Sequence, residues 1–143
     1  MTITKLIKRA LIAASFVAVT PVANAEIAIV VNPDSGMASA TASEISQLFL
    51  GKRNEIDGQP ARAIDQEEGS EARDEFYTKV VEKTGSQLNA YWSRLIFTGK
   101  GMPPDKVMDD ADVIDMVSEE TDLVGYVRPS SVTENVKVIL VIP

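Results

Sequence analysis

The sequence contains no cysteine and no histidine in its 143 residues. Without thiolate or imidazole ligands, the usual zinc, copper and iron sites are excluded. The same absence removes the Cys–His and Ser–His pairs on which most nucleophilic catalysis depends. We therefore expect a protein that is not an enzyme, with no catalytic residues and no cofactor, whose fold is held by packing without disulfides.

Positive charge is also scarce. The chain has 14 basic against 21 acidic residues, and three of the basic residues lie within the first 25 positions. Residues 26–143 therefore carry 11 basic and 21 acidic residues, a formal charge of −10. A surface this acidic repels nucleic-acid phosphates and anionic lipids, so we expect neither nucleic acid nor a membrane surface as a partner.

Long apolar runs are absent except near the N-terminus. Three basic residues precede an apolar run at 10–19, and the small-residue pattern Ala23-Asn24-Ala25 follows. This is the pattern of a secretory signal peptide, residues 1–25, with cleavage predicted after Ala25; an uncleaved N-terminal anchor is the alternative. No other run approaches the roughly 18 residues of a membrane span. We expect residues 26–143 to form one periplasmic domain with no membrane span.

Within residues 26–143, β-branched runs alternate with amphipathic stretches. Strands are predicted at 26–31, 59–65, 123–127 and 136–142, and helices at about 42–50, 71–84, 87–97 and 110–118. In the third helix, Ser86 is the predicted cap, and the predicted buried stripe consists of Leu88, Tyr91, Trp92, Leu95 and Ile96. Gly125, within a strand, indicates a close approach by a neighbouring segment. The alternation favours an α/β domain with a mainly parallel sheet flanked by helices, and leaves the strand order open.

An acidic turn between the second strand and the second helix is the most informative stretch. Ser70 has the position of a helix N-cap, and backbone N–H groups of a first helical turn form a natural anion pocket. The rim of this pocket, however, carries Glu67, Glu68 and Glu71, which oppose an anion. The turn therefore combines the geometry of an anion site with the wrong sign of charge.

Three short motifs follow one another in an informative order: Phe49-Leu50-Gly51-Lys52, Glu68-Gly69-Ser70 and Val124-Gly125-Tyr126-Val127. With these motifs, the chain resembles the phosphate-type substrate-binding proteins of ABC importers, which are type II periplasmic binding proteins. The resemblance covers nearly all of residues 26–143. It implies the fold of a binding-protein lobe, with phosphate or another small oxyanion as ligand and an ABC permease as partner in ion transport.

The chain departs from this family in two ways. It is long enough for one lobe only, whereas the family encloses its ligand between two. The family's phosphate-binding turn, Arg-x-x-Gly-Ser-Gly-Thr, aligns with residues 66–72, where Gln66 stands at the Arg position and Glu71 begins the Glu-Ala that replaces Gly-Thr. Arg73, one residue further, is the candidate source of the missing positive charge. The ligand-binding residues that the resemblance implies are Gln66, Gly69, Ser70, Glu71 and Arg73.

These observations leave two main functions open. The first is a periplasmic solute-binding-type protein with weak phosphate or oxyanion binding or sensing. The second is an interaction module that keeps the fold, has lost the solute, and binds another envelope protein or a second copy of itself as a homodimer. The acidic clusters at 65–71 and 105–112 suggest Ca²⁺, but neither has EF-hand spacing, so we expect no metal site.

Overall fold

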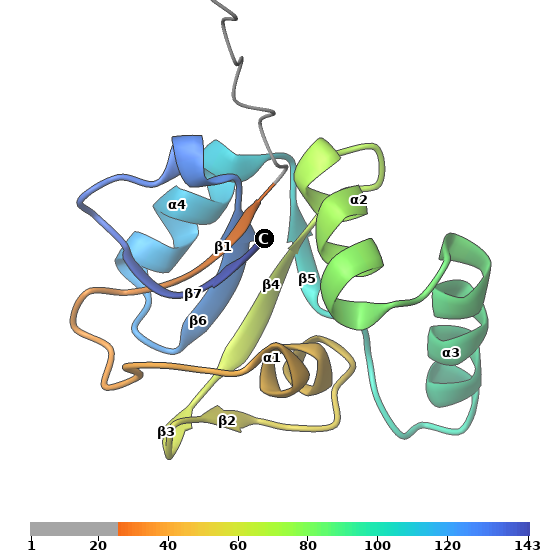
Figure 1. The fold of residues 1–143 in the computed structure, drawn as a ribbon. Coiled ribbons are helices and arrows are strands. Elements are labelled where there is room, and N and C mark those ends of the chain that lie inside the picture. The colour runs from red at the N-terminus through yellow and green to blue at the C-terminus, as the bar shows by residue number, and fades with distance from the viewer. Residues whose placement is uncertain (1–25) are drawn as a thin grey trace, which may run out of the picture.

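A computed structural model describes residues 26–143; the predicted signal peptide lies outside the described residues. Figure 1 shows a sheet with helices on both faces. In chain order the elements are β1 (Ile27–Val31), α1 (Ala42–Phe49), β2 (Glu55–Ile56), β3 (Gln59–Pro60), β4 (Arg62–Gln66), α2 (Glu71–Phe76), η1 (Tyr77–Val81), α3 (Gly85–Phe97), β5 (Asp105–Val107), α4 (Asp110–Glu119), β6 (Leu123–Val127), η2 (Pro129–Ser131) and β7 (Lys137–Ile142). No helix among residues 26–143 is long and apolar enough to cross a membrane.

The main sheet has five strands in the order β5-β4-β6-β1-β7. The predicted α/β class is confirmed, but the sheet is mixed rather than mainly parallel. β4 pairs in parallel with β5 and β6, whereas β1 pairs antiparallel with β6 and β7. Parallel pairing requires long crossovers, and α2 to α4 supply them between β4, β5 and β6. β1 runs in the opposite direction to both of its neighbours.

Two apolar clusters hold the helices to the sheet. One lies between the sheet and α1, α2 and α3, and stacks Phe76 on Tyr126 with ring centroids 4.0 Å apart. The other lies between the sheet and α4. β1, the strand between β6 and β7, is buried along its whole length. This two-sided burial explains its unbroken apolar sequence, since both faces of the strand contact helices or neighbouring side chains.

The second and third helices differ from the sequence prediction at their ends. The helix that begins after Ser70 widens into the π-helical turn η1, where the Glu82 N–H donates to the Tyr77 carbonyl, and it ends there instead of reaching Gly85. α3 is capped by Thr84 in a reciprocal capping box with Gln87, not by Ser86. Threonine three residues before glutamine satisfies two backbone N–H groups at once, which a cap at Ser86 would not.

The predicted apolar stripe of α3 is only partly buried. Leu88 and Trp92 are buried, Tyr91 and Leu95 are half-buried, and Ile96 is 48% exposed. The C-terminal turn of this helix therefore extends beyond the core, as its position at the side of the molecule in Figure 1 indicates.

Candidate functional site

The candidate site lies where β4 and β6 end. These parallel neighbours bring Gln66 and Arg128 to the same edge of the sheet, next to the first turns of α2 and α4. In open α/β sheets, ligands bind outside the carboxyl ends of the strands. The acidic turn that the sequence singled out thus lies at the edge where a ligand site is expected.

Asp65, the penultimate residue of β4, is a buried carboxylate at the centre of a polar cluster. It is 1% exposed and accepts hydrogen bonds from the Arg73 guanidinium at 2.9 Å and from the hydroxyls of Tyr77 and Tyr126. The Gln66 backbone N–H donates to the same carboxylate at 2.8 Å. A buried charge is tolerated only when it is paired and fully hydrogen-bonded, and Asp65 meets both conditions.

This cluster shifts the acidity of its members. Burial raises the pKa of the Tyr77 and Tyr126 hydroxyls, and the negative charge of Asp65 raises both further. Burial is the largest single influence on the pKa of Arg73 and lowers it, but the interactions with Asp65, Tyr77 and Tyr126 together outweigh burial, so the pKa is raised. Arg73 therefore stays charged and both tyrosines stay neutral.

Gln66 occupies the position that the family's turn gives to arginine, and its side chain is fully buried. The amide nitrogen donates to Asp110 Oδ1 and to the Tyr126 carbonyl, both at 2.9 Å, while the amide oxygen accepts from the Ser70 hydroxyl at 2.5 Å. Ser70 Oγ in turn accepts from the Arg73 N–H at 3.3 Å, which is the predicted N-cap. Gln66 and Ser70 thus bind each other and the backbone.

A second cationic side chain, which sequence reasoning missed, reaches the turn from β6. The Arg128 side chain is half exposed; its Nη1 lies 2.8 Å from Glu71 Oε2, and its Nε lies 3.4 Å from Asp110 Oδ2. Asp110, buried in the first turn of α4, also accepts from the Arg128 N–H at 3.1 Å and from Ser131 Oγ at 2.7 Å. Glu71 is 82% exposed, so its pairing with Arg128 lies open to solvent.

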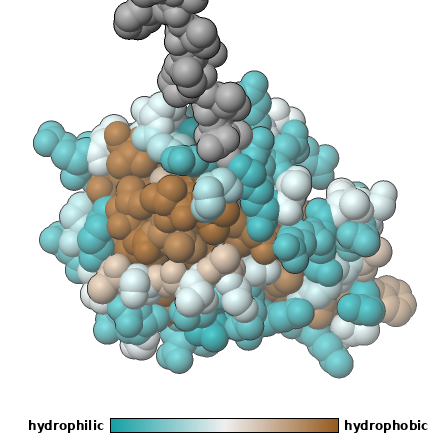
Figure 2. Space-filling view, viewed as in Figure 1, coloured by the Kyte–Doolittle hydropathy of each residue, from teal (hydrophilic) through white to brown (hydrophobic). Residues whose placement is uncertain are grey.

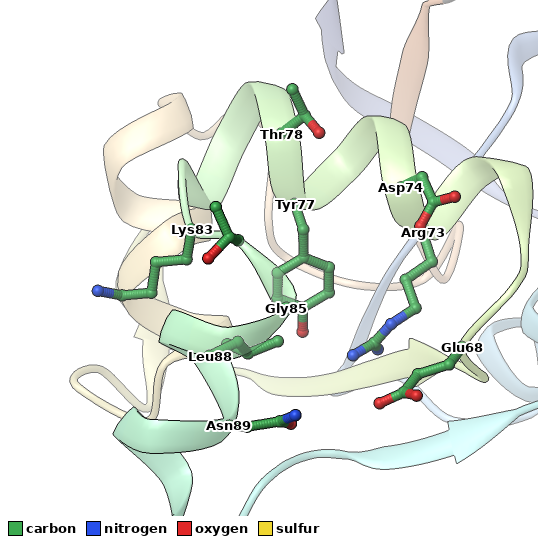
Figure 3. Close-up of a pocket in the computed structure, with 10 residues that line it drawn as sticks. Glu68, Arg73, Asp74, Tyr77, Thr78, Lys83, Gly85, Leu88 and Asn89 are labelled. Atoms are coloured by element: carbon green, nitrogen blue, oxygen red, sulfur yellow. The ribbon is translucent and has the colours of Figure 1, made fainter.

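A cleft of about 370 Å³ opens beside this cluster, between α2 and α3. Figure 3 shows the Arg73 guanidinium and the Tyr77 ring pointing into it, with Leu88 and Asn89 on the α3 side and Glu68 at the rim. The guanidinium carbon lies 4.5 Å from the centroid of the Tyr77 ring, and Nη1 is shared between Asp65 and the Gln66 carbonyl. Arg73 thus lines the cleft while its charge is balanced from below by Asp65.

The structure separates the five predicted ligand-binding residues into two groups. Gly69, Ser70 and Glu71 form the outer turn, in which Gly69 has φ = 92°, a conformation that favours glycine. Gln66 and Arg73 are buried beneath this turn and hold its shape. In the sequence, the feature that could have indicated Arg128 was its position directly after the β6 strand. That position points to the site only once the pairing of β4 with β6 is known.

The acidic clusters do not assemble into a cation site. Among residues 26–143, no group of three or more acidic side chains comes together in an arrangement that could hold a metal ion. Asp65 and Asp110 instead face cationic and amide donors, and Asp109 caps α4 by accepting from the Asp112 N–H at 3.0 Å. The clusters are therefore divided between the buried network and helix capping.

The fold resembles one lobe of the substrate-binding proteins of phosphate ABC transporters. No protein-family model and no curated protein matches the sequence. Among solved structures, the chain is similar to an ABC-type phosphate transport receptor from Vibrio cholerae, with a TM-score of 0.64 and 20% identity over 80% of this chain and 46% of that one.

Two further structures show the same relation. A Clostridium perfringens protein assigned to the phosphate ABC transporter substrate-binding proteins, solved with bound phosphate, has a TM-score of 0.63 and 18% identity, covering 80% of this chain and 45% of that one. PstS from Borrelia burgdorferi has a TM-score of 0.59 and 12% identity, covering 80% and 47%. The chain spans about half the length of these proteins, and identities this low establish the fold alone.

Proposed function

We propose that this protein is a periplasmic, non-enzymatic solute-binding-type lobe that binds phosphate or a similar oxyanion weakly, at the outer turn formed by Gly69, Ser70 and Glu71. The similarity to proteins of phosphate transport supports the ligand class. The position of the turn at the carboxyl ends of β4 and β6 supports the location.

The observation that carries this proposal is the pairing of Arg128 with Glu71. A carboxylate is itself an oxyanion, and the Glu71 carboxylate marks where the Arg128 guanidinium holds one, at 2.8 Å from Nη1. Exposed ion pairs contribute only about 0–1 kcal/mol, so a solute oxyanion competes with Glu71 at little cost. Gln66 and Arg73 lie beneath the turn and support it through their own hydrogen bonds. The exposed guanidinium of Arg128 is not used for this support.

The expected affinity is low. A hydrogen bond to a charged group contributes roughly 1.5–3 kcal/mol, whereas association costs several kcal/mol and the flanking glutamates subtract more. Millimolar binding, about −4 kcal/mol, is therefore what a single lobe offers. A permease or another envelope protein that covered the turn would supply the second surface and strengthen binding.

Calorimetric titration with phosphate and sulfate tests the proposal. Glu71→Gln frees Nη1 of Arg128, while Nε stays paired with Asp110, and should tighten binding about fivefold, the equivalent of one exposed pair of about 1 kcal/mol. Glu67→Gln is the matched control, because it removes an equal charge from the same exposed turn without an ion pair to Arg128 and should change affinity less. Arg128→Gln should abolish binding. Absence of binding at tens of millimolar, by both the folded native protein and Glu71→Gln, overturns the proposal.

The second function, an interaction module without a solute, is favoured by a specific observation. Both arginines at this edge are already paired with carboxylates, Arg73 with Asp65 and Arg128 with Asp110 and Glu71. If neither oxyanion binds to Glu71→Gln, the paired arginines are structural and this second function replaces the first.

A further inference from the structure

We propose that the free edge of β7 is a homodimer interface, in which two copies of β7 pair antiparallel about a two-fold axis and join two sheets into one. This inference is independent of the oxyanion site. β7 lies at one end of the sheet and pairs only with β1 among the strands described. The edge of a sheet presents unpaired N–H and C=O groups, which form a template for another strand.

The two edges of the sheet differ in how they are protected. β5, at one end, has three residues, of which Asp105 and Lys106 are charged and exposed. β7, at the other end, has six residues, and the five from Val138 to Ile142 are all apolar. Charged residues and short length protect edge strands from pairing with another chain. The β5 edge has both features, whereas the β7 edge has neither.

Apolar side chains of β7 are also exposed on the face of the sheet. Val138 is 37% exposed and Val141 is 49% exposed. In Figure 2 a broad apolar area occupies the part of the surface where β1, β6 and β7 cross in Figure 1, while most of the remaining surface in view is polar. Contiguous apolar patches on an otherwise polar surface mark interaction sites.

An irregularity in β7 makes the strand self-complementary about its own centre. Leu140 pairs with Ile29 and Val138 with Val30, so Ile139 is an extra residue in the ladder. As a result Ile139, Leu140 and Ile142 all contact the same core cluster, while Val138 and Val141 lie exposed. Opposed residues of antiparallel strands must face the same side. A two-fold axis between residues 139 and 140 meets this condition, because it places Val138 opposite Val141 of the second copy.

Charge supports the same register. Two molecules that each carry a charge of −10 over residues 26–143 repel each other, but residues 135–143 contain no acidic residue and one basic residue, Lys137. The two-fold arrangement places Lys137 opposite Ile142 of the second copy, so the two lysines lie at opposite ends of the interface.

Sedimentation equilibrium of the native protein, compared with Val141→Lys, tests the interface. We expect a reversible dimer with a dissociation constant on the order of 10 µM or weaker, because one strand buries little area. Val141→Lys should raise the constant at least about tenfold, since two lysines would enter the apolar pairing. Met108→Lys is the matched control, because Met108 is 71% exposed and lies outside β7. A monomer at about 1 mM, or a dimer that Val141→Lys leaves intact, overturns the proposal.

A separate experiment tests the register. Because the native sequence contains no cysteine, only the introduced cysteines can form a disulfide. Val138→Cys mixed with Val141→Cys should give a disulfide-linked heterodimer under mild oxidation, and neither variant alone should cross-link efficiently. Cross-linking of each variant with itself but not with the other contradicts the two-fold register. The two-fold places the outer turns of the two copies at opposite ends of the joined sheet, so dimer formation and oxyanion binding are measured independently.

Discussion

At the scale of single residues, Asp65 determines the shape of the candidate site. Its carboxylate binds Arg73 from α2, Tyr77 from η1 and Tyr126 from β6, so one side chain joins three elements beneath the outer turn. Each of these donors is buried with it. A buried pair of this kind adds little stability compared with apolar packing, but removing one partner leaves the other charge uncompensated.

Asp65→Asn should therefore destabilise the protein by about 3–5 kcal/mol, because Arg73 would remain charged and buried without its partner. Urea unfolding followed by circular dichroism measures the change. Asp122→Asn serves as the control, because Asp122 pairs with Arg62 on the exposed surface and its loss should cost less than about 1 kcal/mol. Equal effects of the two substitutions would contradict the buried, stabilising role of the Asp65 cluster.

At the scale of elements, local chemistry was readable from the sequence and long-range pairing was not. The cap at Ser70 and the strand from Leu123 follow from residues close together in the chain, and the structure has both. β5 was missed, because three residues with two charges have no apolar pattern and form a strand only by pairing with β4. Arg128 was missed for the same reason, since its partners at the site, Glu71 and Asp110, come from α2 and α4.

Gly125 is a position where the sequence did indicate a long-range contact. A Cβ added there would lie 2.5 Å from Val113 Cγ1 and 3.1 Å from Ile64 Cγ2, so α4 packs directly on the β6 backbone. Gly125→Ala should destabilise the protein by about 1–3 kcal/mol through overpacking. The measurement is again urea unfolding.

Two variants make this test specific. Gly85→Ala, at the first residue of α3, meets no atom within 4 Å and should be neutral or stabilising by up to about 1 kcal/mol. Val113→Ala combined with Gly125→Ala should cost less than the sum of the two single changes, because the shorter side chain makes room for the new methyl group. Strict additivity would indicate that the helix does not contact this glycine.

At the scale of the whole molecule, the raised pKa values of Tyr77 and Tyr126 couple the stability of the fold to alkaline pH. In the unfolded chain both phenols ionise near their ordinary pKa of 10.0, whereas in the folded protein burial and Asp65 keep them protonated. Their contribution to stability is therefore fully present below about pH 10 and is lost as the pH rises further. The sign follows because above that pH the unfolded state binds fewer protons than the folded state.

Two such groups should lower the free energy of unfolding by up to about 2.7 kcal/mol for each pH unit above pH 10. Urea unfolding between about pH 8 and pH 11 measures this slope, and phenolate absorbance reports ionisation directly. Tyr77→Phe removes one titrating hydroxyl and should roughly halve the slope, although it also leaves Asp65 with one donor fewer and lowers stability at neutral pH.

In the folded protein these phenols should ionise only as the chain unfolds. Phenolate absorbance from all three tyrosines near pH 10, with the circular dichroism unchanged, would contradict the burial of this cluster and with it the rigid support proposed for the outer turn.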